Sequence, residues 1–187
     1  MSVITIPAPR PPWIIRSQRP LRRITRAVDS CPAGPYGPTV LENDASVGAI
    51  AWSDPDLARL GDDAYATATT VVQDTQRLNA TGFNFQIVPG QQIDGILVEV
   101  EAKVLLGTAT VLCRIIKGGV VSATTISGTW TTTEGFVSYG SSTNLWGETW
   151  TAADINASNF GVSIRQEDAL TSTLSCALSN SSSDTDS

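Results

Sequence analysis

The chain has 187 residues, enough for one ordinary domain with a sizeable hydrophobic core and a short appendage. Only 16% of the residues are charged and none is histidine, so the commonest general base and the commonest zinc ligand are both absent. The formal net charge of −6 conceals a division, because residues 1–28 carry +6 whereas residues 29–187 carry −12.

Residues 1–28 form a basic, proline-rich segment that we expect to act as an extended arm. The segment holds half of the chain's ten prolines and six arginines, without any acidic residue. Such a composition favours a polyproline-like path, which at ~3.1 Å per residue could reach on the order of 80 Å. From Pro20 onward, the spacing of Leu21, Ile24 and Val28 predicts one or two helical turns that form on docking.

The arm has three interpretations: a solvated tail, a nucleic-acid contact, or a segment that docks on an acidic protein surface. Apolar side chains among the arginines argue against a tail that stays in water. Arginines can neutralise phosphates, but the acidic body would repel a polyanion, so we do not expect nucleic acid as the partner. Docking on protein accounts for both kinds of side chain. The residues expected to dock are Arg10, Trp13, Ile14, Arg16, Arg19, Arg22, Arg23 and Arg26.

The rest of the chain divides into a linker at 29–46, a β-sandwich domain at 47–179 and a polar tail at 180–187. Turn residues recur about every eight to twelve positions and no long helical pattern is present, which is typical of antiparallel sandwiches. We therefore expect an all-β fold, an antiparallel jelly-roll-type β-sandwich with an extended N-terminal arm. The expected strands are 39–41, 64–72, 78–85, 96–104, 108–116, 120–127, 129–137, 160–165 and 174–178.

Residues 96–104 give the clearest strand prediction in the chain. Apolar residues occupy every second position, which predicts that one face of the strand is buried and the other solvated. The expected buried set is Ile96, Val98, Val100, Ala102 and Val104, and the expected solvated set is Leu97, Glu99, Glu101 and Lys103.

Residues 139–165 contain a tryptophan-bearing corner around which we expect the domain to close. Trp146 and Trp150 lie four residues apart, and side chains of this size usually bury most of their area. Thr151 is a suitable N-cap for a single helical turn. The alternation within 160–165 then predicts a strand with one buried and one solvated face.

The three cysteines, Cys31, Cys113 and Cys176, are odd in number and lack metal-ligand spacing. Cys113 shares its strand phase with Val111 and Ile115, so we expect a buried free thiol and no Cys113–Cys176 disulfide. This use of cysteine fits a reducing compartment. No apolar run approaches a membrane span or the core of a signal peptide, so we expect neither a membrane partner nor secretion by that route.

The sequence offers few candidates for chemistry. Paired carboxylates occur in the turns at 62–63 and 167–168 and on the solvated side of 96–104, where solubility and turn formation explain them better than a glycosidase pair. The cluster of Asp54, Asp56, Asp62 and Asp63 is the better candidate for calcium, although it matches no known calcium loop. Trp130 and Tyr139 are candidate glycan contacts. We expect no catalytic residue, no bound metal, no cofactor and no enzymatic activity.

Several spaced motifs together resemble a family of β-sandwich structural proteins of tailed-phage and prophage virions, found on capsids, necks and tail parts. The likeness covers roughly residues 48–168 and leaves out the arm. Its motifs are 89–96 (PGQQIDGI), 98–101 (VEVE), 117–119 (KGG), 139–142 (YGSS), 145–147 (LWG), 150–151 (WT) and 159–162 (NFGV).

The resemblance implies a non-enzymatic virion protein, assembled in the cytoplasm of a bacterial host. We expect a capsid cement or decoration protein, a homotrimer whose arm docks on the major capsid protein or on other virion subunits. A neck or tail component would use the same arm to lock a ring. A carbohydrate-binding adhesin, with the arm as its anchor, is the alternative from a different functional class.

Overall fold

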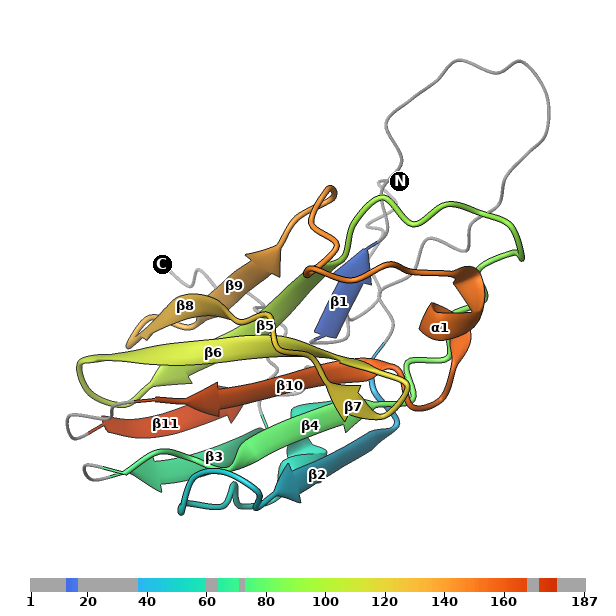
Figure 1. The fold of residues 1–187 in the computed structure, drawn as a ribbon. Helices are drawn as coiled ribbons and strands as arrows, with labels where there is room; N and C mark the ends of the chain where they lie inside the picture. The colour runs from blue at the N-terminus through green and yellow to red at the C-terminus, as the bar shows by residue number, and fades with distance from the viewer. Residues whose placement is uncertain (1–12, 17–36, 60–63, 71–72, 168–171, 178–187) are drawn as a thin grey trace, which may run out of the picture.

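The computed structural model describes residues 13–16, 37–59, 64–70, 73–167 and 172–177, with the backbone alone for 13–16, Thr70 and 172–177. The described chain is mostly β-structure in antiparallel sheets, as predicted (Figure 1). The strands are β1 (Trp13–Arg16), β2 (Val40–Asp44), β3 (Tyr65–Thr70), β4 (Arg77–Thr81), β5 (Leu97–Val104), β6 (Thr108–Lys117), β7 (Val120–Val121), β8 (Ile126–Thr131), β9 (Gly135–Gly140), β10 (Gly161–Gln166) and β11 (Ser172–Ala177). Two short helices accompany them, the 3₁₀ helix η1 (Pro55–Arg59) and the α-helix α1 (Ala152–Asn156).

The strands form two sheets whose order interleaves distant parts of the chain. In the first sheet β3 pairs with β11, β11 with β5, and β5 also with β1 and β9. In the second sheet the order is β2-β4-β10-β6, and β6 also pairs with β7 and β8. Figure 1 shows β6, β10, β4 and β2 running side by side. Every named strand pair is antiparallel.

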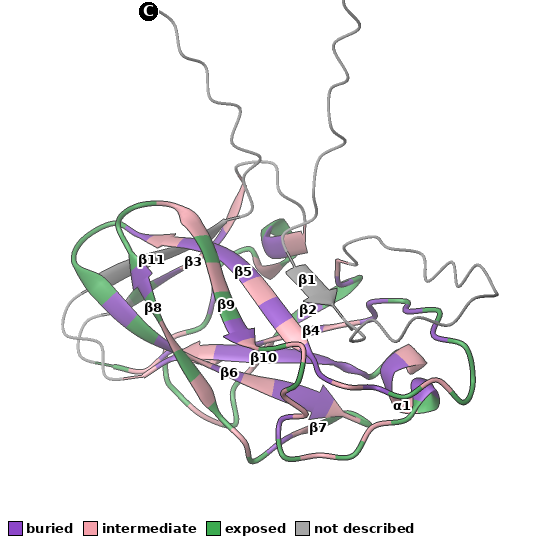
Figure 2. Cartoon of the chain, turned by 90° about the horizontal axis from the view of Figure 1, so that it is seen from above, coloured by how far each residue is buried: buried purple, intermediate pink, exposed green. Residues whose placement is uncertain are grey.

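The hydrophobic core receives side chains from both sheets. The inward residues of β5 that the alternation predicted are all buried, which confirms the strand and its phase. On the second sheet, Val111, Cys113 and Ile115 of β6 are also completely buried. Figure 2 shows the alternation along β5 as buried segments separated by less buried ones. Period-two patterning therefore located the core faces of both sheets.

The prediction failed in the region of 120–137, where the expected strands 120–127 and 129–137 have wrong boundaries. β7 has two residues, and the chain reverses between the end of β8 and the start of β9. The Thr131 hydroxyl donates to the Thr133 carbonyl at 3.1 Å inside this reversal. Threonine-rich composition favours strand but cannot show where a strand ends, so the turn was missed.

The predicted solvated face of 160–165 is also wrong in part. Phe160, Val162 and Ile164 are buried as expected, but Ser163 on the opposite face is only 2% exposed. β10 is paired on both edges, to β4 and to β6, so long side chains on these neighbours can cover a small one between them. The same reasoning applies to Glu101, which lies on a strand paired on both edges and is 4% exposed, although the sequence placed it on the solvated face.

The arm lies almost entirely outside the described residues. Its described part is β1, which pairs with β5 through the register Trp13↔Val100 to Arg16↔Leu97. The side chains of Trp13, Ile14 and Arg16 are not described. The predicted helical turns after Pro20 and the polar tail also lie outside the described residues, as do the other expected docking residues, Arg10, Arg19, Arg22, Arg23 and Arg26.

Candidate functional site

The tryptophan corner is a structural element of the core. Trp146 has a positive φ of 58° and is completely buried. Its indole N–H donates to the Ile96 carbonyl at 2.9 Å, and its backbone N–H donates to the Asn144 side chain at 2.7 Å. The loop before α1 is therefore fastened to the start of β5 by a buried hydrogen bond, as the core interpretation of Trp146 predicted.

Gly140 permits this close approach. A Cβ atom at this position would lie 2.5 Å from the Ile96 carbonyl oxygen and 2.9 Å from the Trp146 indole nitrogen. The backbone of Gly140 also has a φ of +77°, a conformation that residues other than glycine rarely adopt. Glycine is therefore required at this position on two independent grounds.

Helix α1 is short but held at both ends. Thr151 and Asp154 form a capping box, as the prediction of an N-cap at Thr151 indicated. Hydrogen bonds from the Thr151 hydroxyl and backbone N–H lower the pKa of Asp154. At the other end, the Asn156 amide accepts from the Ile87 N–H and donates to the Ile87 carbonyl, both at 2.8 Å. The helix thereby anchors the long connection between β4 and β5.

Trp150 does not present an open platform for a sugar ring. It is partly buried against the core, and its indole N–H donates to the Leu145 carbonyl at 2.9 Å. Phe160 meets its ring edge-on at a centroid distance of 5.6 Å, and the Lys117 ammonium lies 5.1 Å from the ring centre. The faces that a glycan would need are therefore largely occupied, which agrees with the core prediction.

The two residues proposed as glycan contacts are inside the protein, so this prediction is wrong. Trp130 on β8 and Tyr139 on β9 are both 0% exposed. The Trp130 indole N–H donates to the Tyr139 hydroxyl at 2.9 Å, linking strands of the two different sheets. Gly128 leaves room for this pair, because a Cβ there would lie 2.8 Å from the Tyr139 ring. The sequence could not distinguish a buried aromatic pair from an exposed one, since both occupy alternating strand positions.

Cys113 is a buried free thiol, as predicted. Burial raises the pKa of this thiol well above its ordinary value, so the reactive thiolate is disfavoured. Cys176 lies on β11 with its side chain undescribed, and Cys31 lies outside the described residues.

The carboxylates of the described chain do not gather into a site for metal or for acid–base chemistry. No group of three or more carboxylate or cysteine side chains that could hold a metal ion occurs within the described ranges. Asp56 in the loop considered for calcium pairs with Arg59 at 2.5 Å, and the turn at 62–63 lies outside those ranges.

A polar cluster that the sequence did not predict joins three segments on the outer side of the first sheet. The Glu134 carboxylate accepts from Lys103 at 2.7 Å and from the Tyr65 hydroxyl at 2.6 Å. The hydrogen bonds to Glu134 and Tyr65 raise the pKa of Lys103, and burial followed by the bond to Glu134 raises that of Tyr65. Neither shift moves a group towards neutral pH, so this cluster lacks the usual mark of a general acid or base.

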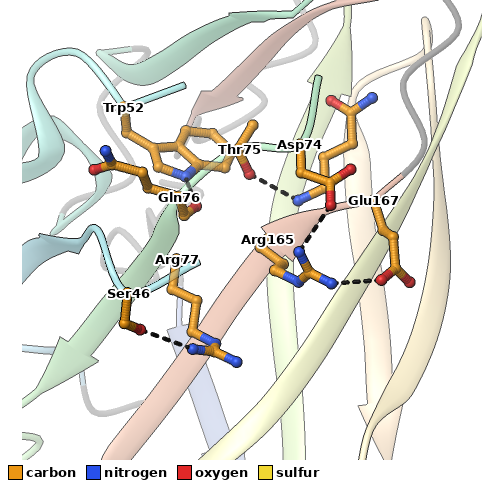
Figure 3. A network of polar contacts seen from close by, with 9 residues as sticks. Ser46, Trp52, Asp74, Thr75, Gln76, Arg77, Arg165 and Glu167 are labelled. Carbon is orange, nitrogen blue, oxygen red and sulfur yellow. Dashed lines mark hydrogen bonds and ion pairs between the residues drawn. The ribbon is translucent and has the colours of Figure 1, made fainter. Parts of the chain in front are cut away.

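A second polar cluster lies on the outer face of the other sheet (Figure 3). Arg165 on β10 contacts Asp74 at 2.9 Å and also pairs with Glu167, and Figure 3 shows its guanidinium between the two carboxylates. Arg77 on β4 donates to the Ser46 hydroxyl at 3.2 Å. These contacts surround a shallow depression lined by Arg77, Leu112, Arg114, Ser163 and Arg165. We call it the arginine depression.

Comparison with known proteins identifies no relative. No family model matches the chain, and it matches no curated protein and no solved structure. Within the described residues, no helix has the length and apolar character needed to cross a membrane.

Proposed function

We propose that the chain is a non-enzymatic structural protein of a phage virion, built as a jelly-roll β-sandwich. The order of its strands carries the proposal. One sheet has the strand order β3-β11-β5-β9 and the other has the order β4-β10-β6-β8. Strands that follow each other in the sequence, such as β3 and β4 or β5 and β6, therefore hold the same position in opposite sheets. This interleaving supports an eight-stranded jelly roll, an architecture used by viral capsid proteins and by lectins.

The most specific role that we propose is capsid cement or decoration. The arm is the only strongly basic part of a chain whose remainder carries −12. The parts of the arm outside β1, which pairs with β5 of the same domain, can lie along the seam between capsid subunits and add contact area without a large folded interface. The expected partners are the major capsid protein or other virion subunits, with the folded domain forming a homotrimer. A neck or tail position remains the alternative within the same class.

The lectin-like alternative receives less support. The two aromatic residues proposed to hold a glycan are buried, and Trp150 is covered by Phe160 and Lys117. A carbohydrate site on a rigid scaffold normally offers an exposed aromatic face. A glycan array screened with the full chain tests this alternative directly, and a specific hit would favour the adhesin.

The deciding experiment is a cryo-EM reconstruction of particles produced by the phage or induced prophage that encodes this chain. Density for the folded domain on the outside of the capsid supports the cement role, and density at the neck or tail supports the alternative. A variant lacking residues 1–28 is then added to particles that lack the protein. We expect it to remain folded by circular dichroism but to leave the particle unoccupied. Full occupancy without the arm would contradict the docking role.

A further inference from the structure

The arginine depression brings together most of the arginines of an otherwise acidic domain. Residues 29–187 carry −12 and contain only four arginines, yet three of these, Arg77, Arg114 and Arg165, line this one depression. They come from three neighbouring strands, β4, β6 and β10, whose spacing is about 4.8 Å from strand to strand. Like charges on neighbouring strands repel one another, so nearby negative groups are needed to offset their closeness.

The three guanidinium groups differ in how far their charge is already compensated. Arg165 pairs with Asp74 and Glu167, as described above. Arg77 has one carboxylate partner, Asp44, at the longer distance of 3.7 Å. Arg114 makes no hydrogen bond or ion pair with any part of the chain that the structure describes. Arg114 is therefore the guanidinium of the depression that has no carboxylate partner of its own among the described residues.

Burial and the nearby charge of Arg114 lower the pKa of Arg77, and Arg165 lowers it further. The side chains of Arg77 and Arg165 are only 14% and 16% exposed, so water compensates their charges incompletely. An anion placed among these groups would relieve the repulsion between them.

The floor of the depression holds a buried hydroxyl without a partner in the described chain. Ser163 is 2% exposed and lies on the outward face of β10, between the inward-facing Val162 and Ile164. Its hydroxyl has no hydrogen-bond partner among the described residues. A buried hydroxyl without a partner is unfavourable by comparison with a bonded one, and native proteins contain few of them. The hydroxyl lines the same depression as the arginines and can donate one hydrogen bond into it.

We propose that the arginine depression binds a single oxyanion, a phosphate, sulfate or carboxylate group. Arg114 supplies a planar fork of N–H donors, Arg77 supplies a second charge, and the Ser163 hydroxyl donates from below. Forked guanidinium donors match two oxygens of one such group, and hydrogen bonds to an ionised acceptor are about twice as strong as neutral ones. The depression encloses no space for a whole small molecule, so the anion would rest on its surface as the terminal group of a ligand or as an acidic side chain of a partner. This site would exist whether or not the chain is a virion protein.

The test is an NMR titration of the ¹⁵N-labelled full chain with sodium phosphate, sodium sulfate or sodium acetate, at an ionic strength held constant with sodium chloride. We expect saturable shifts of amides in β4, β6 and β10, larger for the doubly charged probes. Tighter binding of acetate would support the same site and point to a carboxylate ligand. No saturable shift with any probe would overturn the proposal.

Variants separate the site from a general effect of charge. Arg114→Gln should weaken binding about tenfold or more, since a hydrogen bond to a charged group is lost. Lys117→Gln is the matched control, because it removes one positive charge from the same strand outside the depression. Equal weakening by both variants would mean that only net charge matters, which contradicts a built site.

The thermal stability of Ser163→Ala, measured with and without phosphate, distinguishes a hydroxyl that binds an anion from one that has only a structural role. Without anion, this variant should melt at the same temperature as the parent or higher, because a buried hydroxyl without a partner is removed. With phosphate, the parent should gain more stability than the variant, since only a bound ligand stabilises the folded state specifically. Phosphate also stabilises proteins by exclusion from their surface, but that effect is common to both chains and cancels in the difference. An equal gain in both chains would refute the role of Ser163.

Discussion

Replacement of Gly140 by alanine tests whether the tryptophan corner is as tightly packed as the structure indicates. Gly107→Ala is its matched control, because Gly107 has a similar φ of +72° but no atom within 4 Å of an added Cβ. Alanine at a positive φ costs about 1–2 kcal/mol, and both variants include this cost. At Gly140 the new methyl group also meets the Ile96 carbonyl oxygen at 2.5 Å and the Trp146 indole nitrogen at 2.9 Å.

Forcing a methyl group into a packed core costs typically ~1–3 kcal/mol beyond the backbone term. Gly140→Ala should therefore lose about 1–3 kcal/mol more than Gly107→Ala, equivalent to a Tm difference of roughly 2–12 °C for a domain of this size. Urea unfolding measures the difference in free energy and thermal unfolding measures the difference in Tm, each followed by tryptophan fluorescence and by circular dichroism. Displacement of Trp146 should also move the emission of the folded Gly140→Ala variant to longer wavelength. If the two variants have equal stability and equal emission, the corner is not packed as described.

Three further predictions follow from particular contacts. Tyr139→Phe should lower the free energy of unfolding by about 1–3 kcal/mol, because it leaves the buried Trp130 indole N–H without an acceptor. A double-mutant cycle with Trp130→Phe should give a coupling free energy above about 0.5 kcal/mol, and a coupling of zero would show that the hydrogen bond contributes nothing. The Cys113 thiol should react with a thiol reagent only as fast as the domain unfolds, and rapid labelling in native buffer, assigned to Cys113 by peptide mapping, would contradict its burial. Thr151→Ala should destabilise the domain by about 1 kcal/mol at pH 7. The hydrogen bonds from Thr151 lower the pKa of Asp154, so the stability difference between parent and variant should have its full size above the ordinary pKa of 3.8 and should shrink as the pH falls below it. A stability difference that stays constant down to the acid transition would exclude a role of the Asp154 carboxylate.

Sequence patterns within a short stretch correctly predicted those features that depend on neighbouring residues alone. The inward phase of β5, the burial of Trp146 and the N-cap at Thr151 each depend on residues close together in the sequence. Composition could not predict where β8 ends and β9 begins, since β-branched residues continue through the turn.

The candidate site escaped prediction for a different reason. Arg77, Arg114 and Arg165 are dozens of residues apart, and only the pairing of β4, β10 and β6 brings them together. Ser163 looked like an ordinary solvated position of an alternating strand, because its burial comes from neighbours on other strands. The glycan prediction for Trp130 and Tyr139 failed likewise, since strand phase identifies a face but not whether another sheet covers it.

The position of β11 between β3 and β5 also bears on how the chain folds during synthesis. Tyr65 pairs with Ala177 and Ser172 with Thr70, so β3 must wait for nearly the whole chain before it acquires its neighbour. Until then, the facing edges of β3 and β5 have no β11 to bind, and unpaired edges of this kind favour association with other chains. Contacts between such distant segments also slow folding, because a long loop must close before they form. Synthesis that stops before residue 172 should therefore yield an aggregation-prone product, whereas completion of β11 pairs the facing edges of β3 and β5.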